Sequence, residues 1–534
     1  MKKFAGAVAA FLLLSLLPYL HAQLAPEHTY TGDLLRRVKL ENSGEKYYVL
    51  DRTAGELRFY NADHSPWKTV TLSGAQGMNI RSVDYVTETR IDPDQGLEIA
   101  YTCEPVSGVS YVYKTLVVRE DGSILLDRNN TYPSYIQVQE EENLPARLIV
   151  REETGAFPDS FHVYTLPGMQ WQHSYYGKGL KRVYLENSGE KYYLLDQADE
   201  RIRLYNADHS PWKTVHLPVV PGGSILRVEH VSETKFNQDA LLEIGYHCQD
   251  TSFRNRITSE NGQLLLDTAC CMGQRLSLID GLPARLILLP DGFGSNTRYH
   301  VYSVPGLIRE YTYTSFAFQF DRIRLEESGE KYILKNHFSS YLSLYNADHS
   351  PWKTMMFNVS PGFGQSELHH ISETRIDPDN MLEACYIAGN MPETEGWVRK
   401  EDGSVLLHLP GARTFALSEI PGLSNKLLAT VDTSTGNLHV YSLPSATYVG
   451  LEPEAALPDG ISVYPNPASS SFVLESDKML KNVYISSMNG TAARQVNVYT
   501  NKTTVDISGL RPGLYVISGS SEDGVPFRKK IVVQ

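Results

Sequence analysis

Cysteine is scarce in this sequence, and its spacing does not suit metal binding. The five cysteines are Cys103, Cys248, Cys270, Cys271 and Cys385. An odd number cannot all form disulfides within one chain, and no cysteine or histidine pair has the spacing of a zinc site. We therefore expect no bound metal ion, and we expect buried thiols that act as small apolar side chains.

Positive charge and long apolar runs are also in short supply. The 49 Lys and Arg against 62 Asp and Glu give a formal net charge of −13, whereas a nucleic-acid-binding surface must be basic. After residue 20 no apolar run approaches the roughly 20 residues of a membrane-spanning helix. The signature motifs of serine hydrolases, zinc proteases and P-loop enzymes are missing. We expect no nucleic-acid partner, no membrane span in the mature chain, no cofactor and no recognisable catalytic residue.

The first 22 residues have the pattern of a secretory signal peptide. Lys2 and Lys3 precede an apolar run over residues 4–20 that is interrupted by Pro18, and Ala22 offers a small residue at a cleavage point. We therefore expect residues 1–22 to be removed during export.

A ten-residue string occurs three times without change, at Tyr60–Thr69, Tyr205–Thr214 and Tyr345–Thr354. A block resembling Leu40–Tyr47 precedes each copy, and a block resembling Thr87–Asp94 follows it. A His-Val-Tyr triplet closes each unit. This long internal repeat predicts three structurally equivalent units, at about residues 35–177, 180–313 and 321–450.

Each unit reads as three groups of four short alternating strands separated by turn residues, without a helical period. Groups of four strands in series are typical of propeller blades. We therefore predict an all-β, β-propeller-like domain over residues 23–450 with about nine blades. Residues 28–34 resemble a displaced final strand that pairs with the last blade and closes the ring. A row of separate β-sandwiches is the alternative, although no linkers separate the units.

The repeated string carries residues that invite a functional interpretation. Asp could bind calcium, His could titrate or bind a metal, and Trp could stack on sugars, but one Asp and one Asn per turn fall short of the six to eight oxygens of calcium. Asn, Asp and Pro at a turn favour a structural role. The candidate residues are Asn61, Asp63, His64, Trp67, Asn206, Asp208, His209, Trp212, Asn346, Asp348, His349 and Trp352.

The order Asn61, Asp63, Ser65, Trp67 resembles the Asp box of sialidase-type propellers, Ser-x-Asp-x-Gly-x-Thr-Trp. The Trp comes one residue early and Ser replaces the Gly. In that family the Asp box is a folding motif at the turn between the third and fourth strands of a blade, so the resemblance implies a structural turn and no catalytic role.

Other repeated acidic residues lie within or beside strands. Glu98, Glu243 and Glu383 each lie inside an apolar strand, where strand alternation allows a side chain to face solvent. A pair of carboxylates at a suitable separation could hydrolyse glycosides. His247, His369 and His370 are specific to single units, but they form no recognisable catalytic set.

After a linker at residues 451–458, residues 459–534 open a different pattern of alternating strands. The Val-Tyr-Pro-Asn-Pro opening, a Leu-x-Pro-Gly-Leu-Tyr core and a basic-then-apolar final strand occur in order. This segment is similar to the type A C-terminal sorting domain of the type IX secretion system of Bacteroidota. The motif residues are Tyr464, Pro465, Asn466, Pro467, Gly509, Leu510, Pro512, Gly513 and Tyr515.

The resemblance implies a small Ig-like β-sandwich, the type IX secretion machinery as a partner, and release or attachment at the cell surface. Three functions then stay open for the repeat domain. It could be a binding or adhesion propeller for a glycan or surface-protein ligand, a secreted glycan hydrolase with its site at the propeller channel, or a structural surface protein. The lack of a catalytic motif favours the first.

Overall fold

The computed structural model places strands and turns, and no helix, over the residues that it describes. These are residues 24–443 and 461–533 apart from positions 73–76, 95, 107–111, 141–143, 154, 156–157, 240, 251, 270–272, 290–296, 315–318, 336–339, 358–365, 391–392, 432–435, 488–491, 497–499, 511–512 and 522–525. The expected signal peptide 1–22, the expected linker 451–458, Cys270, Cys271 and Pro512 lie outside them. Among the described residues no helix could cross a membrane.

The repeat region forms nine antiparallel groups of four strands, which we call blades 1 to 9 in chain order. In the first unit, blade 1 contains β2 (Leu34–Leu40), β3 (Gly44–Asp51), β4 (Glu56–Asn61) and β5 (Pro66–Thr71); blade 2 contains β6 (Met78–Thr87), β7 (Glu98–Pro105), β8 (Tyr113–Arg119) and β9 (Ile124–Asn130); blade 3 contains β10 (Ser134–Gln139), β11 (Arg147–Glu152), β12 (Asp159–Thr165) and the first half of β13 (Trp171–Leu185).

The second unit begins inside a continuous strand. β13 pairs with β12 up to Gly177 and with β14 from Lys178, so blades 3 and 4 share it. Blade 4 adds β14 (Gly189–Asp196), β15 (Arg201–Asn206) and β16 (Pro211–His216); blade 5 contains β17 (Ser224–Ser232), β18 (Glu243–Gln249), β19 (Phe253–Ser259) and β20 (Leu264–Thr268); blade 6 contains β21 (Gly273–Ser277), β22 (Arg285–Leu289), β23 (Arg298–Ser303) and β24 (Ile308–Thr314).

The third unit includes the first strand of the chain. Blade 7 contains β25 (Gln319–Leu325), β26 (Gly329–Lys335), β27 (Tyr341–Asn346) and β28 (Pro351–Met356); blade 8 contains β29 (Ser366–Ser372), β30 (Glu383–Asn390), β31 (Glu393–Lys400) and β32 (Val405–Pro410); blade 9 contains β33 (Ala412–Ser418), β34 (Lys426–Val431), β35 (Asn437–Ser442) and β1 (Pro26–Thr31). The prediction of an all-β propeller with three blades per unit is confirmed.

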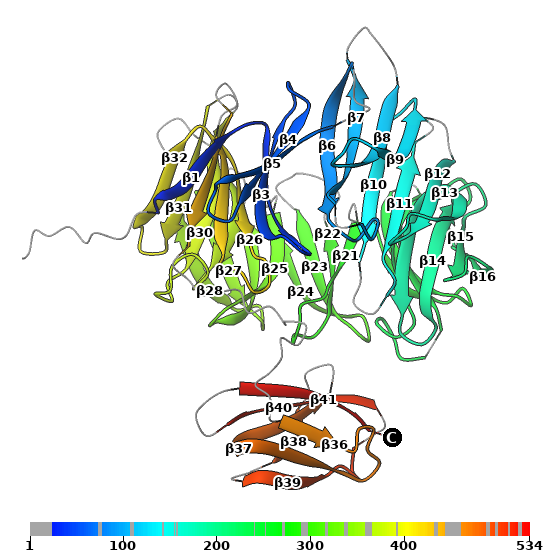
Figure 1. Ribbon diagram of the computed structural model, residues 1–534. Coiled ribbons are helices and arrows are strands. Elements are labelled where there is room, and N and C mark those ends of the chain that lie inside the picture. Colours follow the sequence, from blue (N-terminus) through cyan, green and yellow to red (C-terminus); the bar gives the residue numbers. More distant parts are fainter. Residues whose placement is uncertain are drawn as a thin grey trace, which may run out of the picture. The chain divides into compact units, whose positions relative to one another are not determined.

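Nine hydrophobic clusters hold the blades together, one between each pair of neighbours. Successive side chains of a strand point to opposite faces, so Tyr47 packs toward blade 9 while Tyr48 packs toward blade 2. The cluster of Tyr47 joins the last blade to the first, which closes the ring seen in Figure 1.

Strand β1 takes the place of the missing fourth strand of blade 9. It pairs antiparallel with β35, and the Thr29 hydroxyl lies 2.9 Å from Nδ1 of His439. In blade 3 the same bond joins His162 to Ser174, on the fourth strand, at 2.7 Å. The predicted ring closure is confirmed, with a strand that begins two residues earlier than predicted.

The first strand of each blade lies nearest the axis of the ring. The closest approaches between neighbouring blades involve these first strands, such as β2 with β6, β6 with β10 and β13 with β17. Because blades converge toward the axis of a propeller, their first strands line its central channel. Side chains on these strands therefore decide what the channel can bind.

The C-terminal unit is a separate compact structure, which the described residues show as six strands from Ile461 onward. It contains β36 (Ile461–Tyr464), β37 (Ser471–Ser487), β38 (Ala492–Val496), β39 (Thr500–Asp506), β40 (Gly513–Ser521) and β41 (Pro526–Val533). The long β37 pairs with β36 and β39 in its first half and with β38 and β40 in its second. It is thus shared by both layers, around a core that includes Phe472 and Ile517.

Candidate functional site

The repeated decapeptide forms the turn between the third and fourth strands of blades 1, 4 and 7. In blade 1 the Ser65 backbone amide and hydroxyl both donate to Oδ1 of Asp63, and Nδ2 of the Asn61 side chain donates to the Ser65 hydroxyl at 3.0 Å. The hydroxyl bond of Ser65 is the largest cause that lowers the pKa of Asp63. Equivalent bonds hold Asp208 and Asp348, so these carboxylates are used within their own turns.

The histidine of each copy reaches back to the preceding blade. His64 has a left-handed φ of 65°, and its ring lies 4.6 Å from the parallel ring of His28 on β1. Nδ1 of His209 lies 2.7 Å from the Tyr175 hydroxyl, and Nδ1 of His349 lies 2.8 Å from the Tyr313 hydroxyl. The three copies therefore join blades 9 to 1, 3 to 4 and 6 to 7, which are the boundaries between units.

The tryptophan and lysine of each copy reach forward to the next blade. The half-buried Trp67 ring packs against the cluster between blades 1 and 2, with the ammonium groups of Lys46 and Lys68 at 4.8 and 4.7 Å from its centroid. Lys68 then pairs with Glu120 of blade 2 at 2.7 Å. Trp212 and Trp352 are held by lysines in the same way. Each decapeptide thus contacts three blades.

The repeated blocks before and after each decapeptide are hydrogen-bonded to each other, between the first and second blades of each unit. Glu88, after β6, accepts hydrogen bonds from the amides of Asn42 and Ser43 at 2.7 and 2.9 Å. Glu41 in turn accepts the amide of Glu88 at 2.9 Å. Glu233 and Glu373 repeat the arrangement. These residues are engaged in bonds between the first and second blades of their units.

Three glutamates that the sequence allowed to face solvent are fully buried. Glu98, Glu243 and Glu383 are 0% exposed, because both faces of a blade pack against neighbours in a closed ring. Burial is the largest cause that raises the pKa of Glu243 to about 7 and that of Glu383 to about 9. Strand alternation allowed these carboxylates to be exposed, but the closed ring buries all three.

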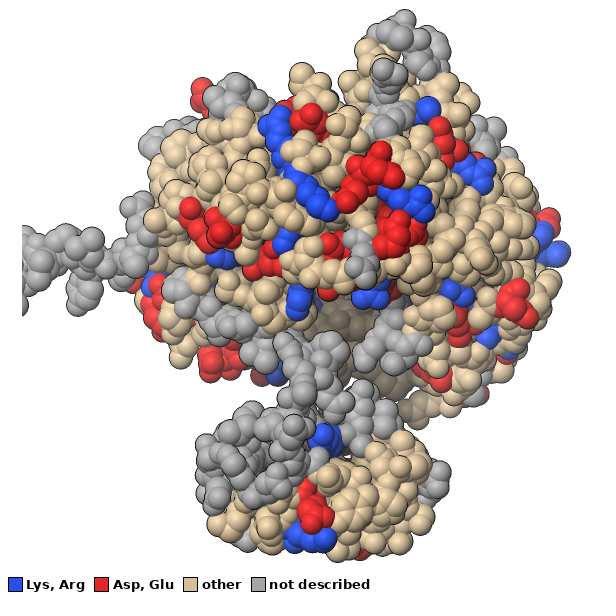
Figure 2. All heavy atoms as spheres, viewed as in Figure 1, with Lys and Arg blue, Asp and Glu red and all other residues tan. Residues whose placement is uncertain are grey.

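A cavity of about 780 Å³ opens at the channel wall of blades 3, 4 and 5, within the usual size range of ligand sites. It is lined from the first strands β10, β13 and β17 and from their neighbours, and Figure 2 shows charged side chains of both signs toward the middle of the propeller. Its polar lining includes Tyr135, Gln137, Gln139, Glu140, Arg151, Lys178, Lys181, Arg182, Arg227 and Glu229. Five of these side chains are cationic and two are anionic, in a protein of net charge −13.

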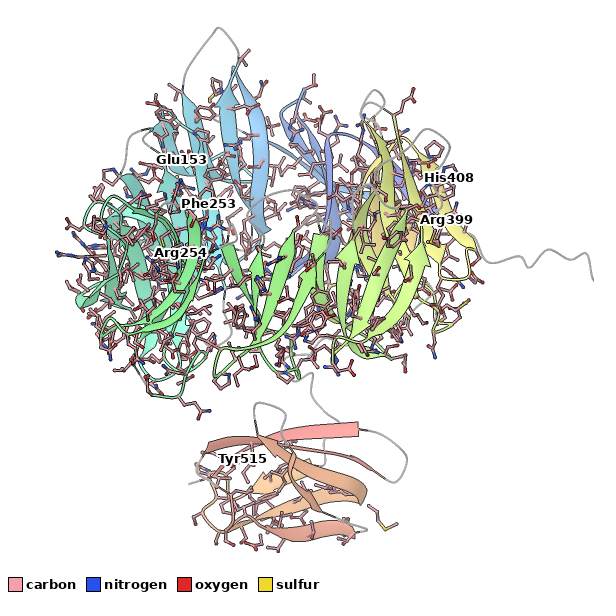
Figure 3. The ribbon with its side chains drawn as sticks, turned by 180° about the vertical axis from the view of Figure 1, so that it is seen from behind. Glu153, Phe253, Arg254, Arg399, His408 and Tyr515 are labelled. Atoms are coloured by element: carbon pink, nitrogen blue, oxygen red, sulfur yellow. The ribbon has the colours of Figure 1, made fainter. Side chains whose placement is uncertain are left out.

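Some cavity cations already have carboxylate partners. Arg151 contacts Asp159 at 2.9 Å and Glu153, labelled in Figure 3, at 3.1 Å. Arg227 pairs with Glu229. Lys181 instead donates to the carbonyl of Val228 at 3.4 Å, and burial by the cavity walls is the largest cause that lowers the pKa of its amine. A ligand anion beside Lys181 would relieve that cost.

Two of the cavity cations, Arg151 and Arg227, are specific to one part of the ring. At the register position of Arg151, the other units have Leu289 and Thr430. At the position of Lys181 they have Arg36 and Asp321, and at the position of Arg227 they have Ser82 and Glu367. The repeated blocks therefore hold the ring, whereas several positions that line the cavity differ among units. Arg182 is an exception, because Arg37 and Arg322 occupy its position and each pairs with a glutamate, as Arg182 does.

The unit-specific histidines do not come together. His247 is buried in blade 5, where burial lowers its pKa to about 4. His369 and His370 line a second cavity of about 180 Å³ between blades 7 and 8, beside Asp321 and Arg375. Two neighbouring histidines and an ion-paired arginine form no triad with a nucleophile among the described lining residues.

In the C-terminal unit, the motif residues connect its two ends. Oδ1 of Asn466 accepts the amide of Val532 at 2.9 Å, and the Ala468 amide donates to the Val532 carbonyl. Tyr515, labelled in Figure 3, lies in the core at 9% exposure. The Tyr-Pro-Asn-Pro opening thus anchors the final strand.

No curated protein sequence matches the chain. Among solved structures, the Dos1 propeller is 10% identical with a TM-score of 0.38, over 79% of this chain and 96% of its own. The dihydro-heme d1 dehydrogenase NirN is 10% identical with a TM-score of 0.37, over 83% and 85%. PorZ of Porphyromonas gingivalis, a surface component of the type IX secretion system, is 9% identical with a TM-score of 0.18, over 95% and 100%.

Because these TM-scores are below 0.5, the propeller assignment depends on the strand pairing and the inter-blade clusters described above. The family comparison is specific to one end of the chain. Residues 462–534 match the model of the secretion system C-terminal sorting domain, so the C-terminal unit belongs to the sorting domains that direct proteins to export by the type IX system.

Proposed function

We propose that the propeller is an exported binding protein that holds an acidic saccharide in the cavity of blades 3 to 5. The observation that carries the proposal is the concentration of cations at this one place in the channel, where Arg151 and Arg227 have uncharged or acidic counterparts in the other units. Arginine and lysine bind carboxylate, phosphate and sulfate groups through charge-assisted hydrogen bonds.

The remaining lining supports a hydroxyl-rich ligand. Tyr135, Gln137 and Gln139 alternate along β10 and line the cavity, and an amide can both donate to and accept from sugar hydroxyls. The guanidinium of Arg81 lies 5.0 Å from the Tyr135 ring centroid and donates to its hydroxyl at 3.1 Å. This contact adds a further cation at the edge of the same wall.

We assign the repeated decapeptides to the stability of the ring and not to ligand binding. Their His, Asp and Trp side chains are engaged in the bonds between blades and within turns described above. The signal peptide at 1–22, the linker at 451–458 and the domain limits at 23–450 and 459–534 complete the proposed organisation. The sorting domain supplies the contact with the secretion machinery.

A glycan hydrolase is the second candidate, because Glu140 and Glu229 both line the cavity. A general acid for glycoside cleavage needs surroundings that keep it protonated. Glu229 instead pairs with Arg227, and Glu140 lies 3.5 Å from Arg90. Both carboxylates already have arginine partners, so binding without cleavage is the better supported function.

A glycan array that includes uronate-, phosphate- and sulfate-bearing saccharides tests the proposal on the purified protein. We expect retention on acidic saccharides, weaker retention on their neutral counterparts, and intact glycans afterwards. Cleaved products would establish the hydrolase instead. Absence of binding to every acidic saccharide would contradict the proposed ligand class and favour a structural surface role.

A further inference from the structure

We propose that the loop between β6 and β7 binds a calcium ion through Asp92, Asp94 and Glu98. Each of these residues offers a carboxylate oxygen, and the three atoms lie within 4.8 Å of one another. Oxygen-only ligand sets suit hard cations, and the flexible coordination of calcium suits a loop better than the strict octahedron of magnesium does.

Glu98 provides an independent reason for a cation at this place. Its side chain is 0% exposed, and neither carboxylate oxygen accepts a hydrogen bond of ordinary length and angle, although the Asp92 amide and the Asp94 carboxyl lie beside it. A buried carboxylate without donors is costly unless it is neutralised or coordinates a metal. Its oxygens belong to the same close group as those of Asp92 and Asp94, so it is directed at the centre of the group.

Arg119 is the cation already present, and it leaves room for a second one. Its guanidinium contacts Oδ2 of Asp92 at 2.9 Å and Oδ2 of Asp94 at 3.0 Å. The two Oδ1 atoms accept loop amides from Asp94 and Gly96, and a carboxylate oxygen with two lone pairs can accept an amide and also bind a metal. Once Glu98 is ionised, three carboxylates and one guanidinium sum to −2, which one divalent cation balances.

The equivalent loop of the second unit shows how such a glutamate is satisfied without a metal. Glu243 accepts the backbone amides of Phe236 and Asn237 at 3.1 and 2.7 Å. Asn237 replaces the first aspartate, and Ser259 replaces the arginine, so a carboxylate and a cation are lost together. Only two carboxylates are left in this loop, and both of the oxygens of Glu243 have donors.

The third unit satisfies its loop with an ammonium group. Lys400, at the position of Arg119, has its Nζ 2.9 Å from Asp377 and also bonds to Asp379. The Ser372 hydroxyl donates to Glu383 at 3.0 Å, whereas the corresponding Thr87 in the first unit bonds to Glu41. The first unit is therefore the one whose glutamate has no well-formed hydrogen bond to either oxygen, and it is the one that we assign to calcium.

Calcium at this loop would strengthen the contact between blades 2 and 3. Ile91 packs in the cluster between these blades, and its carbonyl accepts the amide of Gly168 from blade 3. Three carboxylates supply fewer than the six to eight oxygens of a complete shell, so water must complete it. Affinity in the range of extracellular calcium modules, about 10⁻⁴–10⁻³ M, is expected, and an exported protein meets calcium at such concentrations.

Calorimetric titration of the metal-stripped full chain with CaCl₂, together with its melting temperature in EDTA and in 10 mM Ca²⁺, tests the site. We expect binding with a Kd of about 0.1–1 mM and a higher melting temperature with calcium. The Glu98→Gln variant should lose both effects. The Asp94→Asn variant provides the same test at an exposed position if Glu98→Gln fails to fold.

The matched control is Asp239→Asn, at the position of Asp94 in the second unit, which should keep the full response to calcium. MgCl₂ at the same concentration should give a smaller shift. The proposal is overturned if the unmodified protein shows neither binding heat nor a melting shift in 10 mM Ca²⁺. It is equally overturned if Asp94→Asn and Glu98→Gln respond to calcium as the unmodified protein does.

Discussion

The hydroxyl of Tyr30, on the first strand of the propeller, lies 2.6 Å from Nδ1 of His64 in the first repeated decapeptide. Tyr30 belongs to blade 9 and His64 to blade 1, so this bond spans the junction at which the ring closes. The same bond joins Tyr175 to His209 and Tyr313 to His349 at the other unit boundaries.

The Tyr30→Phe variant should therefore weaken ring closure. It removes the hydroxyl and leaves Nδ1 of a nearly buried histidine without its partner, which costs about 1–2 kcal/mol in the free energy of unfolding. Urea denaturation measures the change. The control is Tyr176→Phe, at 66% exposure, which should leave the denaturation midpoint unchanged. Equal urea midpoints for both variants would mean that the bond does not stabilise the junction between blades 9 and 1.

Trp67→Ala should destabilise the fold by about 2 kcal/mol or more, because a large half-buried ring between blades 1 and 2 is replaced by a methyl group. Thermal unfolding measures the loss, and glycan binding of the folded variant should persist because Trp67 does not line the cavity. An unchanged melting curve with lost ligand binding would reverse the structural interpretation of the decapeptide.

Glu383→Gln should flatten the dependence of stability on alkaline pH. Burial raises the pKa of Glu383 to about 9 from the usual 4.5, so the folded state holds a proton that the unfolded state has lost. The contribution of Glu383 to the free energy of unfolding is therefore fully present below pH 4.5. It decreases as pH rises toward 9, by up to about 1.4 kcal/mol per pH unit. Urea midpoints between pH 6 and 9 measure the slope. A slope unchanged by the substitution would show that Glu383 ionises without cost.

Deletion of residues 459–534 should retain the protein inside the cell envelope, because the truncated chain lacks the sorting domain. Fractionation of the producing bacterium with antibody detection measures its location. The propeller has its own clusters and closing strand, so a folded but retained product is expected. Normal surface display of the truncated chain would contradict the assigned role of this domain.

The sequence was sufficient for the architecture because its signals are local. Repeated blocks, turn residues such as Asn61 and Pro66, and strand alternation predicted the blades, and the displaced strand predicted the closure. Burial of Glu98 was missed because strand alternation exposes one face only when that face lacks a neighbour, and in a closed ring both faces are covered.

The cavity was missed for a different reason. Arg151, Lys181 and Arg227 come from three strands on three blades, so no linear motif connects them. The available signal was the difference among units at otherwise equivalent positions, such as Arg227 against Ser82 and Glu367. Strand register was needed to see that these differences gather at one place on the channel wall.

The most direct test of the proposed function is a binding titration with oligogalacturonate and with its methyl ester, which shares the sugar backbone but lacks the charge. We expect the acid to bind, the ester to bind at least tenfold more weakly, and Lys181→Glu to weaken binding of the acid by about tenfold or more. Arg36→Glu, at the same strand position in the first unit and outside the cavity, should bind like the unmodified protein. Equal affinity for acid and ester, or equal losses for both substitutions, would contradict an acidic-saccharide site at this cavity.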